Sequence, residues 1–178
     1  MMLLVGAVLL GRHVVALPKP PVDPVTTRAF AALREDGDRA SWLAVHVLYA
    51  GCRCSARVVE HLAQSGRSAS VHEVVLWVGS DPQLEARMKT AGFRLLPIEP
   101  EALRQRFGVE AAPLLVVLDP NDRARYVGGY TTRKQGPDIQ DRKILSALLS
   151  GATPEENPVL GCAVSSRLQA ALNPIGVP

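Results

Sequence analysis

The residues of this chain best suited to chemistry are two cysteines, Cys52 and Cys54, separated by a single residue. They follow an apolar run, Trp42 to Tyr49, and precede a segment whose apolar residues recur at helical spacing. A thiol at the start of a helix lies near unpaired backbone N–H groups and the positive end of the helix dipole, and both favour the thiolate over the thiol. This position predicts that Cys52 is a nucleophile.

A disulfide between residues two apart would close a small, strained ring, and strain makes a disulfide easier to reduce. We therefore expect an oxidant or an isomerase-like exchanger more than a strong reductant. Cys52 would attack or be attacked, forming a mixed disulfide with the substrate, and Cys54 would resolve it. Arg53 lies between the two thiols and adds positive charge that favours the thiolate. The alternative is a pair of inert, half-buried thiols, and their position at the start of a helix argues against it.

The third cysteine, Cys162, lies in a C-terminal segment in which apolar residues again recur at helical spacing. This spacing predicts that Cys162 opens a short helix. Three roles stay open for it. Cys162 is either a third redox partner that resolves Cys52 or Cys54 when the segment packs over them, a third metal ligand, or a small hydrophobic residue.

The composition of the 178 residues, with 47% hydrophobic and 21% charged, is typical of one globular domain with short extensions. The net charge is only +3, basic and acidic residues are interleaved, and aromatic residues make up 4%. These values argue against a nucleic-acid partner and against a polybasic membrane patch. Three cysteines are too few for a disulfide scaffold and one short of a four-thiolate metal site. No cofactor is expected, and the oligomeric state is left open.

The N-terminal segment 1–17 is apolar apart from Arg12 and His13, which is typical of a signal peptide or a membrane anchor. A buried helix of the domain is the alternative. The proline-rich segment 18–26 predicts a stiff linker. We therefore expect a periplasmic or other extracytoplasmic protein that is secreted or is associated with the membrane through its N-terminus.

Between residues 27 and 151 the sequence predicts one α/β domain. Apolar runs predict strands at 42–49, 71–78, 93–98, 114–118 and 125–130. Helical spacing or capping signals predict helices at 27–33, from the cysteine pair to the stop at Gly66, and at 82–91, 100–107 and 138–149. The first three strands alternate with helices, which predicts right-handed crossovers and parallel pairing. The turn-rich segment 119–123 predicts a hairpin between the last two strands. Residues 152–178 would form a C-terminal extension with one short helix.

These features resemble the thioredoxin-like superfamily, in particular its TlpA/ResA-like branch of exported or membrane-anchored proteins. The resemblance covers about residues 42–149. It is carried by the cysteine pair at a strand-to-helix junction, by the segment 108–113 before a strand, and by the hairpin region 118–130. The extra strand and helix between Gly79 and Phe107 match an insertion of that branch.

The resemblance implies a thioredoxin-like fold with a mixed sheet and a thiol–disulfide oxidoreductase that acts on protein thiols or disulfides. It also implies that Pro113 follows a cis peptide bond and faces the two thiols. The substrate groove would then be formed by Pro113, Ala112, Gly51 and Arg53. The chain departs from the usual Trp-Cys-x-x-Cys site, since its pattern is Cys-x-Cys without a neighbouring tryptophan. An acidic residue beneath the thiols, frequent in that family, cannot be placed from the sequence.

Two other functions stay open. A Cys-x-Cys pair can hold a soft ion such as Cu(I), and a relative of this fold delivers copper with two cysteines and a histidine. In that copper family, three residues separate the cysteines and the histidine lies near the hairpin, unlike here. His46 and His72 lie inside strands and are predicted to be packed or surface residues. The other alternative is a redox-inactive binding module that holds an extended peptide beside Pro113.

Overall fold

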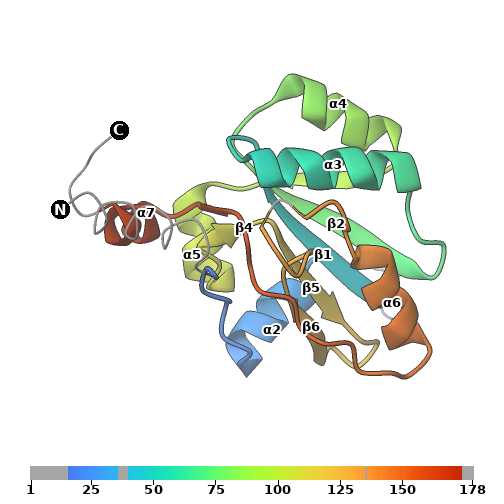
Figure 1. The fold of residues 1–178 in the computed structure, drawn as a ribbon. Coiled ribbons are helices and arrows are strands. Elements are labelled where there is room, and N and C mark those ends of the chain that lie inside the picture. Colours follow the sequence, from blue (N-terminus) through green and yellow to red (C-terminus); the bar gives the residue numbers. More distant parts are fainter. Residues whose placement is uncertain (1–15, 36–39, 135, 174–178) are drawn as a thin grey trace.

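The computed structural model describes residues 16–35, 40–134 and 136–173. In this part of the chain, five strands form a mixed sheet in the order β3-β2-β1-β5-β6 (Figure 1). The strands are β1 (Trp42–Tyr49), β2 (Val71–Val78), β3 (Arg94–Pro97), β5 (Leu114–Leu118) and β6 (Ala124–Gly128). β1, β2 and β3 pair in parallel, and β5 and β6 pair antiparallel beside β1. The predicted α/β fold class with a mixed sheet is confirmed.

Helices cover both faces of this sheet. They are α2 (Pro24–Ala31), α3 (Arg53–Ser65), α4 (Pro82–Thr90), α5 (Pro100–Phe107), α6 (Asp141–Leu149) and α7 (Ser166–Leu172). Side chains of α3, α4 and α6 pack against one face, and side chains of α2 and α5 pack against the other. Because neighbouring strand residues point to opposite faces, β1 sends Val45 and Val47 to one core and Ala44 and Leu48 to the other.

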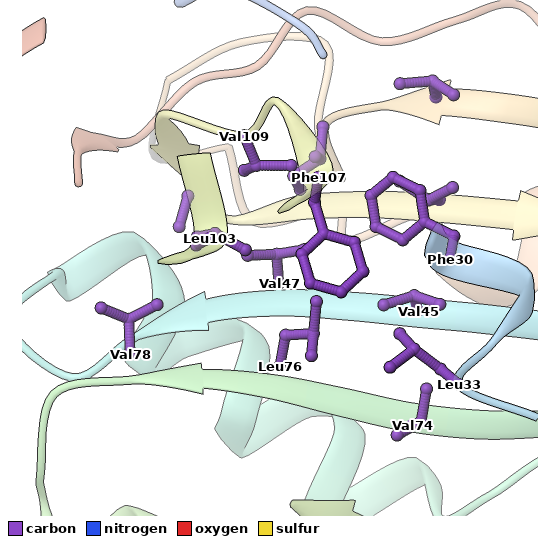
Figure 2. Close-up of a cluster of buried hydrophobic side chains, with 14 of the residues drawn as sticks. Phe30, Leu33, Val45, Val47, Val74, Leu76, Val78, Leu103, Phe107 and Val109 are labelled. Atoms are coloured by element: carbon purple, nitrogen blue, oxygen red, sulfur yellow. The ribbon is translucent and has the colours of Figure 1, made fainter. Parts of the chain in front are cut away.

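The core beneath α2 and α5 is centred on two phenylalanines. Phe30 and Phe107 have ring centroids 4.9 Å apart and lie over the β1 and β2 side chains Val45, Val47 and Leu76 (Figure 2). Both faces of β1 and β2 are therefore buried, which explains why these strands are near-continuous apolar runs.

Two local signals in the sequence, a capping carboxylate and a proline after it, set the starts of α2 and α4. The side chain of Asp81 accepts hydrogen bonds from the backbone amides of Gln83 and Leu84 at 3.0 and 3.1 Å, and Pro82 is the first residue of α4. Asp23 caps α2 in the same way, with its side chain accepting from the amide of Thr26 at 2.7 Å. A carboxylate in this position satisfies amides that have no partner within the helix.

Several element boundaries differ from the predictions by one to three residues. α2 begins at Pro24 and not at residue 27, because Asp23 supplies the cap within the segment predicted to be a linker. Pro20 is buried, and Pro21 lies so close to Gly108 that a Cβ there would be 2.7 Å from the proline ring. The proline-rich segment therefore packs against the domain. α6 begins later than predicted, at Asp141, and β6 ends earlier, at Gly128.

The C-terminal extension differs more. Cys162 does not open a helix but lies in a strand, β7 (Cys162–Ala163), which pairs with β4 (Ala111–Ala112) to form a separate two-stranded sheet. The helix of the extension, α7, begins after the capping residue Ser165. The spacing of Val164 and Leu168 suggested a helix from Cys162 onward, but pairing with β4 holds the first residues extended.

The predicted signal peptide or anchor lies outside the described residues except for Ala16 and Leu17. The amide of Leu17 donates to the carbonyl of Val159 at 2.8 Å. Within the part of the chain that the structure describes, none of the helices has both the length and the apolar character needed to cross a membrane.

Candidate functional site

The cysteine pair lies where β1 ends and α3 begins. Cys52 is the capping residue of α3, and its amide donates to the carbonyl of Tyr49 at 3.0 Å, closing the turn. The buried hydroxyl of Ser55 accepts from the amide of Tyr49 at 3.1 Å and fixes the first turn of the helix against the strand. Cys52 is buried, with 1% of its surface exposed, whereas Cys54 is half-buried.

The third cysteine reaches the same place through β7. In the register of the small sheet, Cys162 lies opposite Ala112, the residue whose peptide bond to Pro113 is cis. The sulfur of Cys52 lies 3.7 Å from the carbonyl oxygen of Ala112. The structure therefore groups Cys52, Cys54 and Cys162, all three as free thiols, beside the Ala112–Pro113 bond.

A glycine allows β7 to approach this closely. A Cβ on Gly161 would lie 1.9 Å from the carbonyl oxygen of Ala112 and 2.6 Å from Cδ of Pro113. Both distances are shorter than any non-bonded contact. The residue before Cys162 must therefore be glycine for the strand to take this position.

Further contacts anchor the segment on both sides of Cys162. Val159 and Val164 are buried in the core that contains Phe30 and Phe107. The carbonyl of Glu110 accepts from the amide of Val164 at 2.7 Å. The carboxylate of Glu110 accepts from the hydroxyl of Ser165 at 2.7 Å and from Nε of Arg167 at 2.9 Å. β7 is thus an integral part of the domain.

The three thiols influence one another's protonation. Hydrogen bonds from Cys162 and then from Cys54 lower the pKa of Cys52, burial opposes this, and the backbone amides of Ser55 and Cys54 lower it further. The hydrogen bonds that Cys54 and Cys162 give to Cys52 raise the pKa of both these thiols. A thiol at Cys52 could instead donate to the carbonyl of Ala112, but several donors converge on this sulfur and favour its thiolate.

A small surface pocket lies beside Cys54. Its lining includes Cys54 and Arg57 from α3, Pro113 before β5, Tyr130 after β6 and Leu160 before β7. The guanidinium of Arg57 donates to the carbonyl of Gly136 at 3.1 Å, which joins α3 to the loop that precedes α6. Among the three cysteines, Cys54 is the one that lines this pocket.

A buried polar network lies beneath Tyr130. Nδ1 of His46 is 2.8 Å from the Tyr130 hydroxyl, and Nε2 of His46 is 3.0 Å from Oε2 of Glu73. Burial raises the pKa of Glu73, but the hydrogen bond and charge of His46, together with the amide of Ser68, lower it overall. His46 is packed, as predicted. Glu73 is a buried acid that the sequence did not single out, although it is the one carboxylate in β2.

The residues predicted to form the site fall into two groups. Cys52, Cys54, Ala112 and Pro113 lie together, and Cys162 joins them. Gly51 and Arg53 are exposed at the start of α3. The backbone edge of Ala112, predicted to hold an extended substrate, is taken by β7.

Three thiols in one place are potential ligands for a soft metal ion. Within residues 16–35, 40–134 and 136–173, no group of three or more histidine, cysteine, aspartate or glutamate side chains is placed to hold a metal ion. The proximity of the three thiols therefore does not by itself provide a coordination geometry.

No protein-family model and no curated protein matches the chain. Among solved structures, a hypothetical protein from Sinorhizobium meliloti is 23% identical, with a TM-score of 0.57 over 71% of this chain and 80% of that one. An uncharacterized conserved protein from Geobacillus kaustophilus is 15% identical, with a TM-score of 0.56 over 85% and 90% of the two chains. At these identities the likeness shows the fold alone.

The structural neighbours also include thioredoxin-like proteins. One is a secreted Mycobacterium tuberculosis disulfide oxidoreductase homologous to E. coli DsbE, 13% identical with a TM-score of 0.45 over 63% of this chain and 87% of that one. The fold is identified by its sheet order. Three parallel strands are followed by an antiparallel hairpin that pairs with β1, and a cysteine lies at the start of the helix after β1.

The fold is thioredoxin-like. The cis bond expected before Pro113 is present. In this thioredoxin-like chain the extension that contains β7 and α7 lies beyond the region of resemblance, residues 42–149, and contributes the third thiol.

Proposed function

We propose that the chain is a thiol–disulfide oxidoreductase whose reactive centre is the group Cys52, Cys54 and Cys162. The observation that carries the proposal is the burial of Cys52 beside two other thiols, which together lower its pKa. The thiolate is the reactive form in disulfide exchange, and a thiol of low pKa is also a good leaving group.

The overall reaction transfers two electrons. A disulfide forms between Cys52 and either Cys54 or Cys162, while a substrate disulfide takes up two electrons and two protons and becomes two thiols. The reverse reaction oxidises a substrate dithiol and returns the protein to its reduced state. All three sulfurs are free in this structure, which therefore corresponds to the reduced state.

The proposed substrates are protein thiols or disulfides in an extracytoplasmic compartment. This location rests on the apolar N-terminal segment 1–17, which is typical of an export signal or membrane anchor. It also suits the chemistry, since disulfides persist outside the reducing cytoplasm.

The proposal is tested with the full-length protein and a model peptide that contains two cysteines. Glutathione disulfide supplies the oxidant, and peptide oxidation is followed by mass after acid quenching. We expect catalytic amounts of protein to accelerate oxidation and Cys52→Ser to abolish the acceleration. Ser146→Ala, on the exposed face of α6, is the control and should behave as the wild type. Equal rates with and without protein would contradict the proposal.

A further inference from the structure

The three thiols differ in how an outside molecule can reach them. From this difference we infer that external thiols and disulfides exchange at Cys54, while Cys52 acts as an internal thiolate. The inference rests on the proposed oxidoreductase function and assigns the point of contact with the substrate. It reverses the expectation from the sequence, in which Cys52 formed the mixed disulfide.

Cys52 is closed off from outside sulfur. Only 1% of its surface is exposed, and its sulfur lies 3.7 Å from the Ala112 carbonyl, beneath the small sheet of β4 and β7. Opening this cover would remove Val159 and Val164 from the core and break the bonds from Ser165 to Glu110. A substrate would have to displace a packed part of the domain to reach Cys52.

The edge beside Pro113 is closed as well. An extended peptide could bind there by pairing its backbone with Ala111 and Ala112, as in other cases of strand addition. β7 already makes this pairing, with Cys162 opposite Ala112 and Ala163 opposite Ala111. While β7 is in place, a protein substrate cannot be held by strand pairing at this edge.

Cys54 remains accessible. It is half-buried and lines the surface pocket with Arg57, Pro113 and Tyr130. Cys162, although also half-buried, is not part of that lining and is held by its backbone in β7. The positive charges of Arg57 and Lys134 act on Cys54 and oppose the rise of its pKa. The same charges attract an approaching thiolate.

The exchange can be written as a balanced sequence that starts from a Cys52–Cys54 disulfide. A substrate thiolate attacks Sγ of Cys54, the bond between the two cysteines breaks, and Cys52 leaves as a thiolate. A second thiolate of the substrate attacks the substrate sulfur of this mixed disulfide and releases Cys54, which takes up a proton. The substrate dithiol has lost two electrons and two protons. One proton is on Cys54, and the other is in solvent.

Cys162 has a positioning role in this sequence. Its thiol donates to Cys52, so it stabilises the sulfur that leaves when Cys54 is attacked. Thiolates of low pKa are better leaving groups, so the lowered pKa of Cys52 speeds attack at Cys54. Cys52 does this without contacting the substrate.

The test compares two full-length variants, Cys52→Ser and Cys54→Ser, after reaction with glutathione disulfide. Peptide mass spectrometry locates the mixed disulfide at short times. We expect Cys52→Ser to accumulate glutathione on Cys54, and Cys54→Ser to label Cys52 more slowly by about tenfold or more, although Cys52 is the better nucleophile. Circular dichroism and thermal unfolding check that both variants fold.

A second measurement uses the wild type, so the result does not depend on the variants. A small and a bulky maleimide are compared, and we expect the bulky reagent to modify Cys54 but not Cys52.

Rapid glutathionylation of Cys52 in Cys54→Ser, or no adduct on Cys54 in Cys52→Ser, would overturn the inference while leaving the oxidoreductase function in place. If the wild type forms no reversible disulfide at all, the proposed function itself fails.

Discussion

Cys162 lies opposite Ala112 in the small sheet, so the C-terminal extension occupies the backbone edge beside Pro113 and brings a third thiol to Cys52. Two segments fifty positions apart in the sequence, β4 and β7, thereby form the cover of the reactive centre. The chemistry of the reactive centre therefore depends on contacts made by β7, which lies outside the thioredoxin-like region 42–149.

Removal of Cys162 should raise the pKa of Cys52. In Cys162→Ala the hydrogen bond that lowers this pKa most is lost, so the pKa should move back toward that of a free thiol, about 8.5. Cys54→Ala removes the second contributor and should raise the pKa less. The thiolate absorbance of the reduced protein, followed against pH, measures both shifts. Identical titrations of wild type and Cys162→Ala would contradict the geometry of the three thiols.

A side chain at position 161 should disrupt the cover. Gly161→Ala places a methyl group where the Ala112 carbonyl lies, so β7 must move away from β4. We expect a loss of about 1–3 kcal/mol in the free energy of unfolding, together with faster alkylation of Cys52. Ala152→Ser, at an exposed position of the same extension, should leave both quantities unchanged. Denaturant unfolding and mass-resolved alkylation provide the measurements.

The contacts of Glu110 should make the attachment of the extension sensitive to pH. The hydrogen bond from Arg167 lowers the pKa of Glu110 most, against burial, and Ser165 adds to the effect. A lowered folded-state pKa stabilises the protein above the unfolded value of about 4.5, and this stabilisation is lost as the pH falls through the folded value.

Glu110→Gln should therefore lower the free energy of unfolding by about 1–3 kcal/mol at neutral pH. The difference from the wild type should shrink in acid. Glu101→Gln alters an exposed carboxylate that bonds Arg104 within α5, and its effect should be smaller. Urea unfolding at several pH values tests this, and a constant difference across the acid range would show that the Glu110 charge contributes nothing.

The pair His46 and Glu73 should also contribute to acid stability. The pKa of Glu73 is raised by burial but lowered overall, chiefly by the hydrogen bond from His46, so its stabilisation holds above about pH 4.5 and is lost in more acidic solution. Glu73→Gln should cost about 1–3 kcal/mol at neutral pH and flatten the acid limb of the stability curve. Glu60→Gln, at an exposed position, is the control. An unchanged acid limb in Glu73→Gln would contradict this role.

Much of the fold could be predicted because its signals are local. The ranges of β1 and β2 are as predicted, since strands buried on both faces read as continuous apolar runs. The position of Cys52 could also be predicted, because the apolar run of β1 ends and helical spacing begins on either side of it. Asp23 followed by Pro24 is also a local helix-start signal, and it marks the start of α2 in the structure.

The site was predicted only in part because its remaining features depend on distant contacts. β7 has only two residues, so its pairing with β4 leaves no periodic pattern in the sequence. The helix that follows it, α7, does leave such a pattern. Glu73 contacts His46 on β1, and His46 in turn contacts Tyr130 after β6, so one acidic residue in β2 could not identify this network. The burial of Cys52 depends likewise on the cover formed by the extension.

The most direct test of the account is an equilibrium redox titration of the full-length protein in glutathione buffers without metal ions. Thiols are trapped by alkylation, and intact and peptide masses identify which cysteines are paired. We expect a reversible two-electron step that joins Cys52 to Cys54 or Cys162. If all three cysteines stay reduced across the range of extracytoplasmic potentials, the protein is not a thiol–disulfide oxidoreductase. Protection of the thiols by added Cu(I) would then favour the metal-binding alternative.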